Sequence, residues 1–206
     1  IKALLAKRTF DDAELTTVPV LNRAESPLAD VDSLLAARWP KAAGIEARAI
    51  LAVSLYLGAN DFADNRTATY DSIQKREYHH VFPDALLSEA GIESYLALNC
   101  ALITWKTNRI IGRKDPLEYL NERVAAADAA SVKERLRSHL ISFHHLSNAH
   151  YAGLSGDELA KKLKEDFAQF LQSRAALVAA AMNKLVAGET PQLEEVWQSQ
   201  SARNAS

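Results

Sequence analysis

Two adjacent histidines, His79 and His80, are the side chains of this chain best suited to chemistry at neutral pH. Imidazole titrates near neutrality, so one ring can accept a proton from water while the other binds a metal ion. A divalent cation nearby would disfavour the protonated ring and so keep the base neutral. Because neighbouring side chains on a regular strand point to opposite faces, a shared site requires the strand to bend or twist before Pro83.

Two asparagines follow the histidine pair and could complete such a site. Asn108 falls within an expected helix, where asparagine is disfavoured by propensity, and its amide oxygen is a hard ligand suited to Mg²⁺. Asn99 precedes an apolar run, and a single asparagine there can also simply stabilise a turn. A histidine pair alone can likewise serve only to make hydrogen bonds in a core, so the ordered set carries more weight than either member.

A local basic stripe surrounds the second asparagine. The stretch from Cys100 to Lys114 holds four basic residues and no acidic one, in a chain of formal net charge −2. Such a stripe suits phosphate contacts, although an ordinary solvated helix face is the equally open alternative. The candidates for nucleic-acid binding are Lys106, Arg109, Arg113 and Lys114.

The other four histidines lie later in the chain, at positions 139, 144, 145 and 150. A zinc site is one interpretation of this group. The adjacent pair His144 and His145 lacks partners at tight metal-site spacing, and no cysteine joins it, so a loop that packs against the first group is favoured. The single cysteine, Cys100, excludes a disulfide within the chain and is expected to be a small buried apolar residue.

Length and composition indicate an ordered globular chain. The 206 residues are 48% hydrophobic and 24% charged, which suffices for one large domain or two small ones. The slightly negative charge excludes an obvious nucleic-acid binder by bulk electrostatics. No apolar run of about 20 residues and no signal peptide is visible, so we expect a cytoplasmic protein without a membrane partner. Because the chain begins with Ile1, we expect a fragment of a longer protein.

Residue patterning predicts a mainly α fold that contains a small ββα segment. The helix expected over 45–57 is apolar nearly all round, which favours a central buried position. Strands are expected over 78–82 and 100–104, where apolar, aromatic and β-branched residues gather. A short helix should follow over 105–111 and end at Gly112.

The second half of the chain is expected to be helical. Pro116 suits a first helical position with Asp115 as its cap, and Ser155 with Glu158 predicts a capping box. Further helices are expected over 117–127, over 132–141, and from Ser155 to about Val186, with a His-rich loop over 142–155. The expected division is an N-terminal helical and loop segment over 1–44, a helical domain over 45–188, and a polar C-terminal tail over 189–206 that frays.

The runs YHHVFPDALL and LNCALITWKTNRIIGRKDPLEYL resemble the HNH, or ββα-metal, endonuclease motif. More narrowly they resemble the C-terminal nuclease part of GmrSD-like bacterial restriction proteins. The resemblance covers about 45–188 and implies a helical domain with the ββα-metal motif embedded at about 76–112. It implies that His79 and Asn108 bind the metal, that His80 is the general base, and that Asn99 braces the motif through hydrogen bonds.

The function implied by this resemblance is metal-dependent cleavage or nicking of DNA in bacterial defence against foreign DNA, whether modified or not. The expected cofactor is one Mg²⁺ or Mn²⁺ ion. The resemblance implies an N-terminal NTPase or sensor domain of the same protein. No GxxxxGK[ST] motif occurs here, so any nucleotide dependence lies outside this chain or is absent. The alternative is a non-catalytic helical DNA-binding or interaction domain with a degenerate HNH motif.

Overall fold

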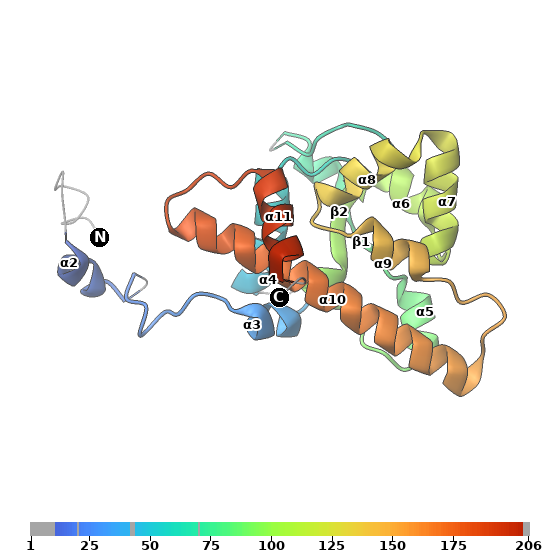
Figure 1. The fold of residues 1–206 in the computed structure, drawn as a ribbon, viewed down its shortest axis with the longest axis horizontal. Coiled ribbons are helices and arrows are strands. Elements are labelled where there is room, and N and C mark those ends of the chain that lie inside the picture. The colour runs from blue at the N-terminus through green and yellow to red at the C-terminus, as the bar shows by residue number, and fades with distance from the viewer. Residues whose placement is uncertain (1–10, 20, 42–43, 70, 204–206) are drawn as a thin grey trace. The chain divides into compact units, whose positions relative to one another are not determined.

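The computed structural model describes residues 11–19, 21–41, 44–69 and 71–203, and these are mainly α-helical, as predicted (Figure 1). The chain divides into two compact units, Ile1–Asp30 and Val31–Ser206. The elements are α2 (Asp12–Thr16), α3 (Val31–Ala36), α4 (Ile45–Tyr56), η1 (Ile73–Lys75), β1 (Arg76–His80), α5 (Asp84–Glu89), η2 (Ala97–Asn99), β2 (Cys100–Thr104), α6 (Trp105–Ile111), α7 (Pro116–Ala126), α8 (Ala129–Arg137), α9 (Phe143–Asn148), α10 (Gly156–Val186) and α11 (Leu193–Arg203).

The first unit contains α2, which begins with a capping box. The Asp11 carboxylate accepts a hydrogen bond from the Glu14 backbone N–H at 2.8 Å, and the Glu14 carboxylate accepts one from the Asp11 N–H at 3.4 Å. The division of the chain after Asp30 differs from the boundary expected at residue 44. Helix α3 therefore belongs to the same unit as α4.

Strands β1 and β2 form a two-stranded antiparallel sheet, and α6 begins at the residue after β2 ends. Their register pairs Arg76 with Thr104 and His80 with Cys100. The second strand and α6 have the predicted bounds, and Gly112 ends α6 with a positive φ of 60° that favours glycine. The first strand lies two residues earlier than predicted, because the backbone of Phe82 bonds to a side chain instead of a strand.

Helix α4 has nearly the predicted bounds, but the prediction that it is a central buried helix was wrong. Ile50, Leu51 and Val53 are buried, whereas Ile45 is 81% exposed and Tyr56 is 52% exposed. The apolar residues on one side of α4 pack against α3, α10 and β2, and those on the other side face solvent. Apolar residues on all sides of a helix therefore do not show how many of its faces are covered by neighbouring elements.

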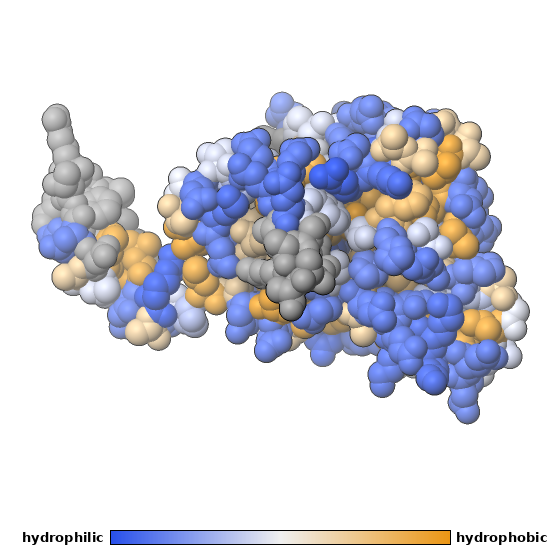
Figure 2. All heavy atoms as spheres, viewed as in Figure 1, coloured by the Kyte–Doolittle hydropathy of each residue, from blue (hydrophilic) through white to orange (hydrophobic). Residues whose placement is uncertain are grey.

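The long helix α10 packs against α3, α4, α9 and α11 (Figure 1). Its apolar stripe is buried, while the outer side of its first half is strongly hydrophilic (Figure 2). Arg174 on this helix is 1% exposed and donates hydrogen bonds to the carbonyls of Leu98 at 2.6 Å and Cys100 at 2.8 Å. It thereby ties α10 to the start of β2. Among the described residues, none of the helices combines the length and apolarity that a bilayer crossing requires.

Four local predictions in the second half of the chain were wrong. Ser155 precedes α10 but makes no side-chain cap bond, so the predicted capping box is absent. The Asp115 carboxylate accepts from the backbone N–H of Tyr151 at 3.2 Å instead of capping α7. The expected His-rich loop contains α9, and the expected frayed tail contains α11, because the buried Val196 anchors that helix.

Buried His139 predicts that the protein loses stability on mild acidification. Its Nε2–H donates to the Asn60 carbonyl, and burial lowers its pKa to about 3. Between the ordinary pKa of 6.5 and about 3, the unfolded chain binds a proton that the folded chain does not. The free energy of unfolding should therefore fall as pH falls, by up to about 1.4 kcal/mol per pH unit for each such histidine.

Urea denaturation at several pH values between 7 and about 4 measures this dependence. In His139→Gln the amide can still donate to the Asn60 carbonyl but does not titrate. The slope of stability against pH should therefore become shallower in this variant. A slope equal to that of the wild type would contradict the assignment.

Candidate active site

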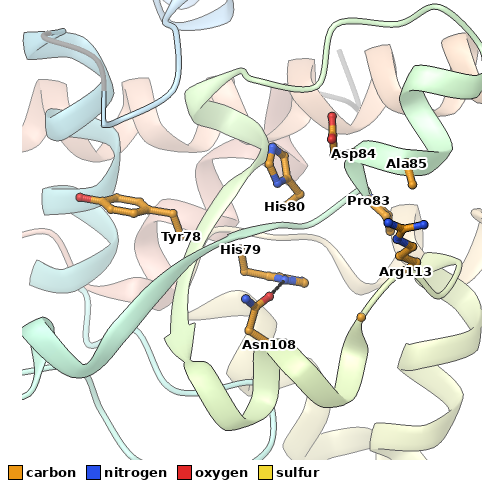
Figure 3. A pocket seen from close by; sticks show the side chains of 9 residues that line it. Tyr78, His79, His80, Pro83, Asp84, Ala85, Asn108 and Arg113 are labelled. Atoms are coloured by element: carbon orange, nitrogen blue, oxygen red, sulfur yellow. Dashed lines mark hydrogen bonds between the residues drawn. The ribbon is translucent and has the colours of Figure 1, made fainter.

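A pocket of about 210 Å³ lies at the end of β1, beside α5 and α6 (Figure 3). Adjacent residues of β1, the first residues of α5 and the second half of α6 meet there, because the turn at Pro83 brings α5 back beside the sheet. The pocket is lined by Tyr78, His79, His80, Pro83, Asp84, Ala85, Asn108, Gly112 and Arg113. Three of the four residues given catalytic or metal-binding roles by sequence therefore line one cavity.

His79 and Asn108 contact one another directly across the sheet–helix interface. The His79 ring is 3% exposed, and its Nδ1 lies 2.7 Å from Asn108 Oδ1 (Figure 3). Phe62 and Tyr119 pack edge-on against the ring of His79. The apolar packing therefore fixes the imidazole plane and leaves its Nδ1 aimed at the amide of α6.

Glu77 sets the orientation of the Asn108 amide and was not among the residues predicted from sequence. Asn108 Nδ2 donates to Glu77 Oε2 at 2.6 Å, which directs Asn108 Oδ1 toward His79. The signal available in the sequence was the spacing: Glu77 lies two residues before His79, on the same face of β1. Its carboxylate also places negative charge beside the His79–Asn108 pair.

His80 projects from the side of β1 opposite to His79 (Figure 3). Its ring contacts a different set of side chains. It stacks on Trp39 with ring centres 4.0 Å apart and meets Tyr95 edge-on at 4.9 Å. Strand β1 stays paired with β2 through His80. The bend that a shared site was expected to require is therefore absent, and the side chains of His79 and His80 point to opposite faces as on any regular strand. Both histidines nevertheless line the same pocket, because the strand ends there.

Both histidines are held in the neutral form at pH 7. Burial lowers the pKa of His79 to about 4, although the hydrogen bond to Asn108 opposes that shift. Burial also lowers the pKa of His80, and the nearby Asp84 carboxylate acts in the opposite direction. The Nε2 atoms of His79 and His80 are buried and have no hydrogen-bond partner among the described residues. Neutral, unsatisfied imidazoles in adjacent residues are unusual in a core that serves packing alone.

Asn99 is fully buried and joins the loop after β1 to the start of β2. Its Oδ1 accepts from the Phe82 N–H at 2.8 Å, and its Nδ2 donates to the Phe82 carbonyl at 3.0 Å and the Ser94 carbonyl at 3.1 Å. These bonds satisfy the backbone of the segment that leads from the histidines into α5. Such a bridge is the kind of contact that a bracing residue would make; its importance for activity stays a prediction.

Asp61, in the segment between α4 and η1, holds the sheet and α6 together. It is fully buried and accepts hydrogen bonds from the Thr104 N–H at 2.6 Å and from the Thr107 hydroxyl, and it lies 3.5 Å from Arg76. The three partners belong to the end of β2, to α6 and to the start of β1. Asp61 therefore fixes how α6 sits on the sheet, and with it the approach of Asn108 to His79.

The four basic residues of the predicted stripe differ in availability. Lys106, Arg109 and Arg113 are exposed, and within the described part of the chain no carboxylate forms an ion pair with them. Arg113 also lines the pocket. Lys114 pairs with Glu122 at 2.7 Å and donates to a backbone carbonyl, so it is the least available for a phosphate.

The imidazole nitrogen of His79 and the amide oxygen of Asn108 are donor types that a Mg²⁺ or Mn²⁺ site can use. The 2.7 Å between His79 Nδ1 and Asn108 Oδ1 is a hydrogen-bond distance, so these two donor atoms face one another and would be the ones to hold an ion. Among the described residues, no three His, Cys, Asp or Glu side chains gather closely enough to hold a metal ion. A zinc site would need such a set, whereas Mg²⁺ keeps several waters and binds substrate phosphates.

Comparison of the chain with models of known protein families, with curated proteins and with solved structures finds no match in any of the three. The functional interpretation therefore depends on the chain's own residues and their geometry.

Proposed function

We propose that this chain is a metal-dependent HNH-type nuclease that hydrolyses a phosphodiester bond of DNA. The observation that carries the proposal is the contact of His79 Nδ1 with Asn108 Oδ1, on an antiparallel strand pair followed at once by a helix. This order and these two ligand positions are those of the ββα-metal motif that the sequence resembles. The neutral His80 on the same pocket supplies a base.

In this proposal the polar residues in and around the pocket have distinct tasks. His80 accepts a proton from the water that attacks the phosphorus, and the leaving 3′-oxygen departs on the opposite side. His79 and Asn108 would hold the divalent ion, and Glu77 keeps the amide oxygen of Asn108 turned toward His79. Asn99 keeps the histidine-bearing segment in place, and Arg113 contacts the phosphate.

The divalent ion would neutralise charge that develops on the phosphate and on the leaving oxygen. A single site of this kind cuts one strand at a time, so nicking is the expected primary activity. Defence against foreign DNA is the biological role that we propose on the basis of the resemblance.

A plasmid-relaxation assay tests this proposal. Supercoiled DNA incubated with the chain should be converted to the relaxed circle in Mg²⁺ or Mn²⁺. Excess chelator should abolish the conversion, and added Mg²⁺ or Mn²⁺ should restore it.

The variant Asn108→Ala removes one proposed ligand and is the matched test of the site. Its activity should be lost at metal concentrations that saturate the wild type. DNA that stays supercoiled with the wild type under all metal conditions would contradict the nuclease. It would favour a binding module that carries a degenerate motif.

A further inference from the structure

Helix α6 begins with a tryptophan that is largely open to solvent. Trp105 is 53% exposed, whereas Trp39 is buried and Trp197 is half-buried with its indole N–H donated to a backbone carbonyl at 3.3 Å. An exposed indole leaves a large apolar face in water, which contributes little to folding stability. Tryptophan in such a position is typical of surfaces that bind a partner.

A guanidinium group lies over this indole. The central carbon of the Arg109 guanidinium is 5.2 Å from the centre of the Trp105 ring. In the part of the chain that the structure describes, no carboxylate forms an ion pair with Arg109, so its charge is not neutralised locally. Planar guanidinium and indole groups both stack on nucleobases, and the positive charge favours a phosphate strand.

Trp105 and Arg109 lie on the same face of α6 as two residues that line the pocket. Trp105, Asn108, Arg109 and Gly112 are spaced three or four residues apart, so they occupy one face of α6. Asn108 and Gly112 line the pocket. One helical turn rises about 5.4 Å, which lies between one and two nucleotide steps of about 3.4 Å. A base on Trp105 would thus belong to a nucleotide close to a phosphate at Asn108.

We propose that Trp105 and Arg109 form a stacking platform for an unpaired base of the nucleic-acid strand that occupies the pocket. In a duplex the faces of each base are covered by its stacked neighbours, so the platform requires a single-stranded or locally opened strand. Stacking tolerates any base, because each has a π-face. The inference rests on the proposed function for the identity of the strand in the pocket, and it names the substrate class as unpaired nucleic acid.

Fluorescence titration of the full chain with a short single-stranded oligodeoxythymidylate, in excess chelator, tests the platform without cleavage. Stacking should quench the emission of the wild type. Trp105→Leu should lose the quenching and bind about 5- to 150-fold more weakly. Trp105→Phe should lose the quenching but recover much of the affinity, because an aromatic ring still stacks.

Tyr56→Leu is the matched control, since Tyr56 is 52% exposed and lies on α4. This variant should bind the strand as tightly as the wild type. Arg109→Lys keeps the charge but loses the planar group, and should also bind more weakly than the wild type. A blunt duplex of thymidylate and its complement should show no dependence on Trp105.

The platform is overturned if Trp105→Leu binds the single strand as tightly as the wild type, if quenching persists in that variant, or if the wild type does not bind the strand at all. Failure of the proposed nuclease is distinguishable from these results. A chain that binds through Trp105 in chelator, yet never relaxes a plasmid in Mg²⁺, keeps the platform and loses the nuclease. A chain that relaxes plasmids while Trp105→Leu binds normally keeps the nuclease and loses the platform.

Discussion

His80→Ala should reduce DNA hydrolysis by about a hundredfold to ten-thousandfold while the fold survives. A positioned general base contributes a rate factor of this order. The ring of His80 stacks on Trp39 but donates no hydrogen bond that the core depends on, since its Nε2 has no partner among the described residues. Initial rates of plasmid relaxation at saturating Mg²⁺, with circular dichroism to check the fold, measure the effect.

The matched comparison is His79→Ala, because the two histidines have different proposed tasks. Loss of a metal ligand should be relieved in part when the Mn²⁺ concentration is raised, whereas loss of the base should not. His144→Ala, in the exposed part of α9, should leave the rate unchanged. A folded His80→Ala protein with wild-type rates would remove His80 from the mechanism. Rescue of His80→Ala but not of His79→Ala by metal would exchange the two roles.

Two elements beside the proposed chemistry, β2 and α6, are those that the sequence predicted best, although β1 lies two residues earlier than predicted. Strand β2 and helix α6 begin and end where the pattern placed them, because an apolar run, a threonine cap and Gly112 are all local signals. The contact of His79 with Asn108 also follows from local rules, once a strand pair leads directly into a helix. The order of residues along β1 and α6 then determines which side chains face one another.

The residues that hold this arrangement together were not predictable in the same way. Asp61 precedes its partners Arg76 and Thr104 by 15 and 43 residues, and nothing local marks it as buried. Glu77 looks like an ordinary exposed strand residue until the Asn108 amide is placed beside it. The segment of helix α9 was predicted to be a His-rich loop, whereas the buried Leu146 shows that packing determines its structure. Contacts at long range in sequence decided each case.

Asp61→Ala should destabilise the protein by about 3–5 kcal/mol, because it leaves the buried guanidinium of Arg76 without its counter-charge. Burial already lowers the pKa of Arg76, which shows that its charged form is poorly solvated where it lies. The Thr104 N–H and the Thr107 hydroxyl lose their acceptor at the same time. Urea denaturation followed by circular dichroism measures the change in the free energy of unfolding.

Asp64→Ala is the matched control, because Asp64 lies in the same segment but pairs with Arg66 at the surface. Its stability should stay close to that of the wild type, since exposed ion pairs contribute little. The double variant Asp61→Ala with Arg76→Met should recover part of the stability lost in Asp61→Ala, because no unpaired charge is then buried. Below its unfolding midpoint, Asp61→Ala should also cleave DNA more slowly, since α6 no longer holds Asn108 against His79. If Asp61→Ala unfolds at the same urea concentration as the wild type, Asp61 does not anchor α6 to the sheet.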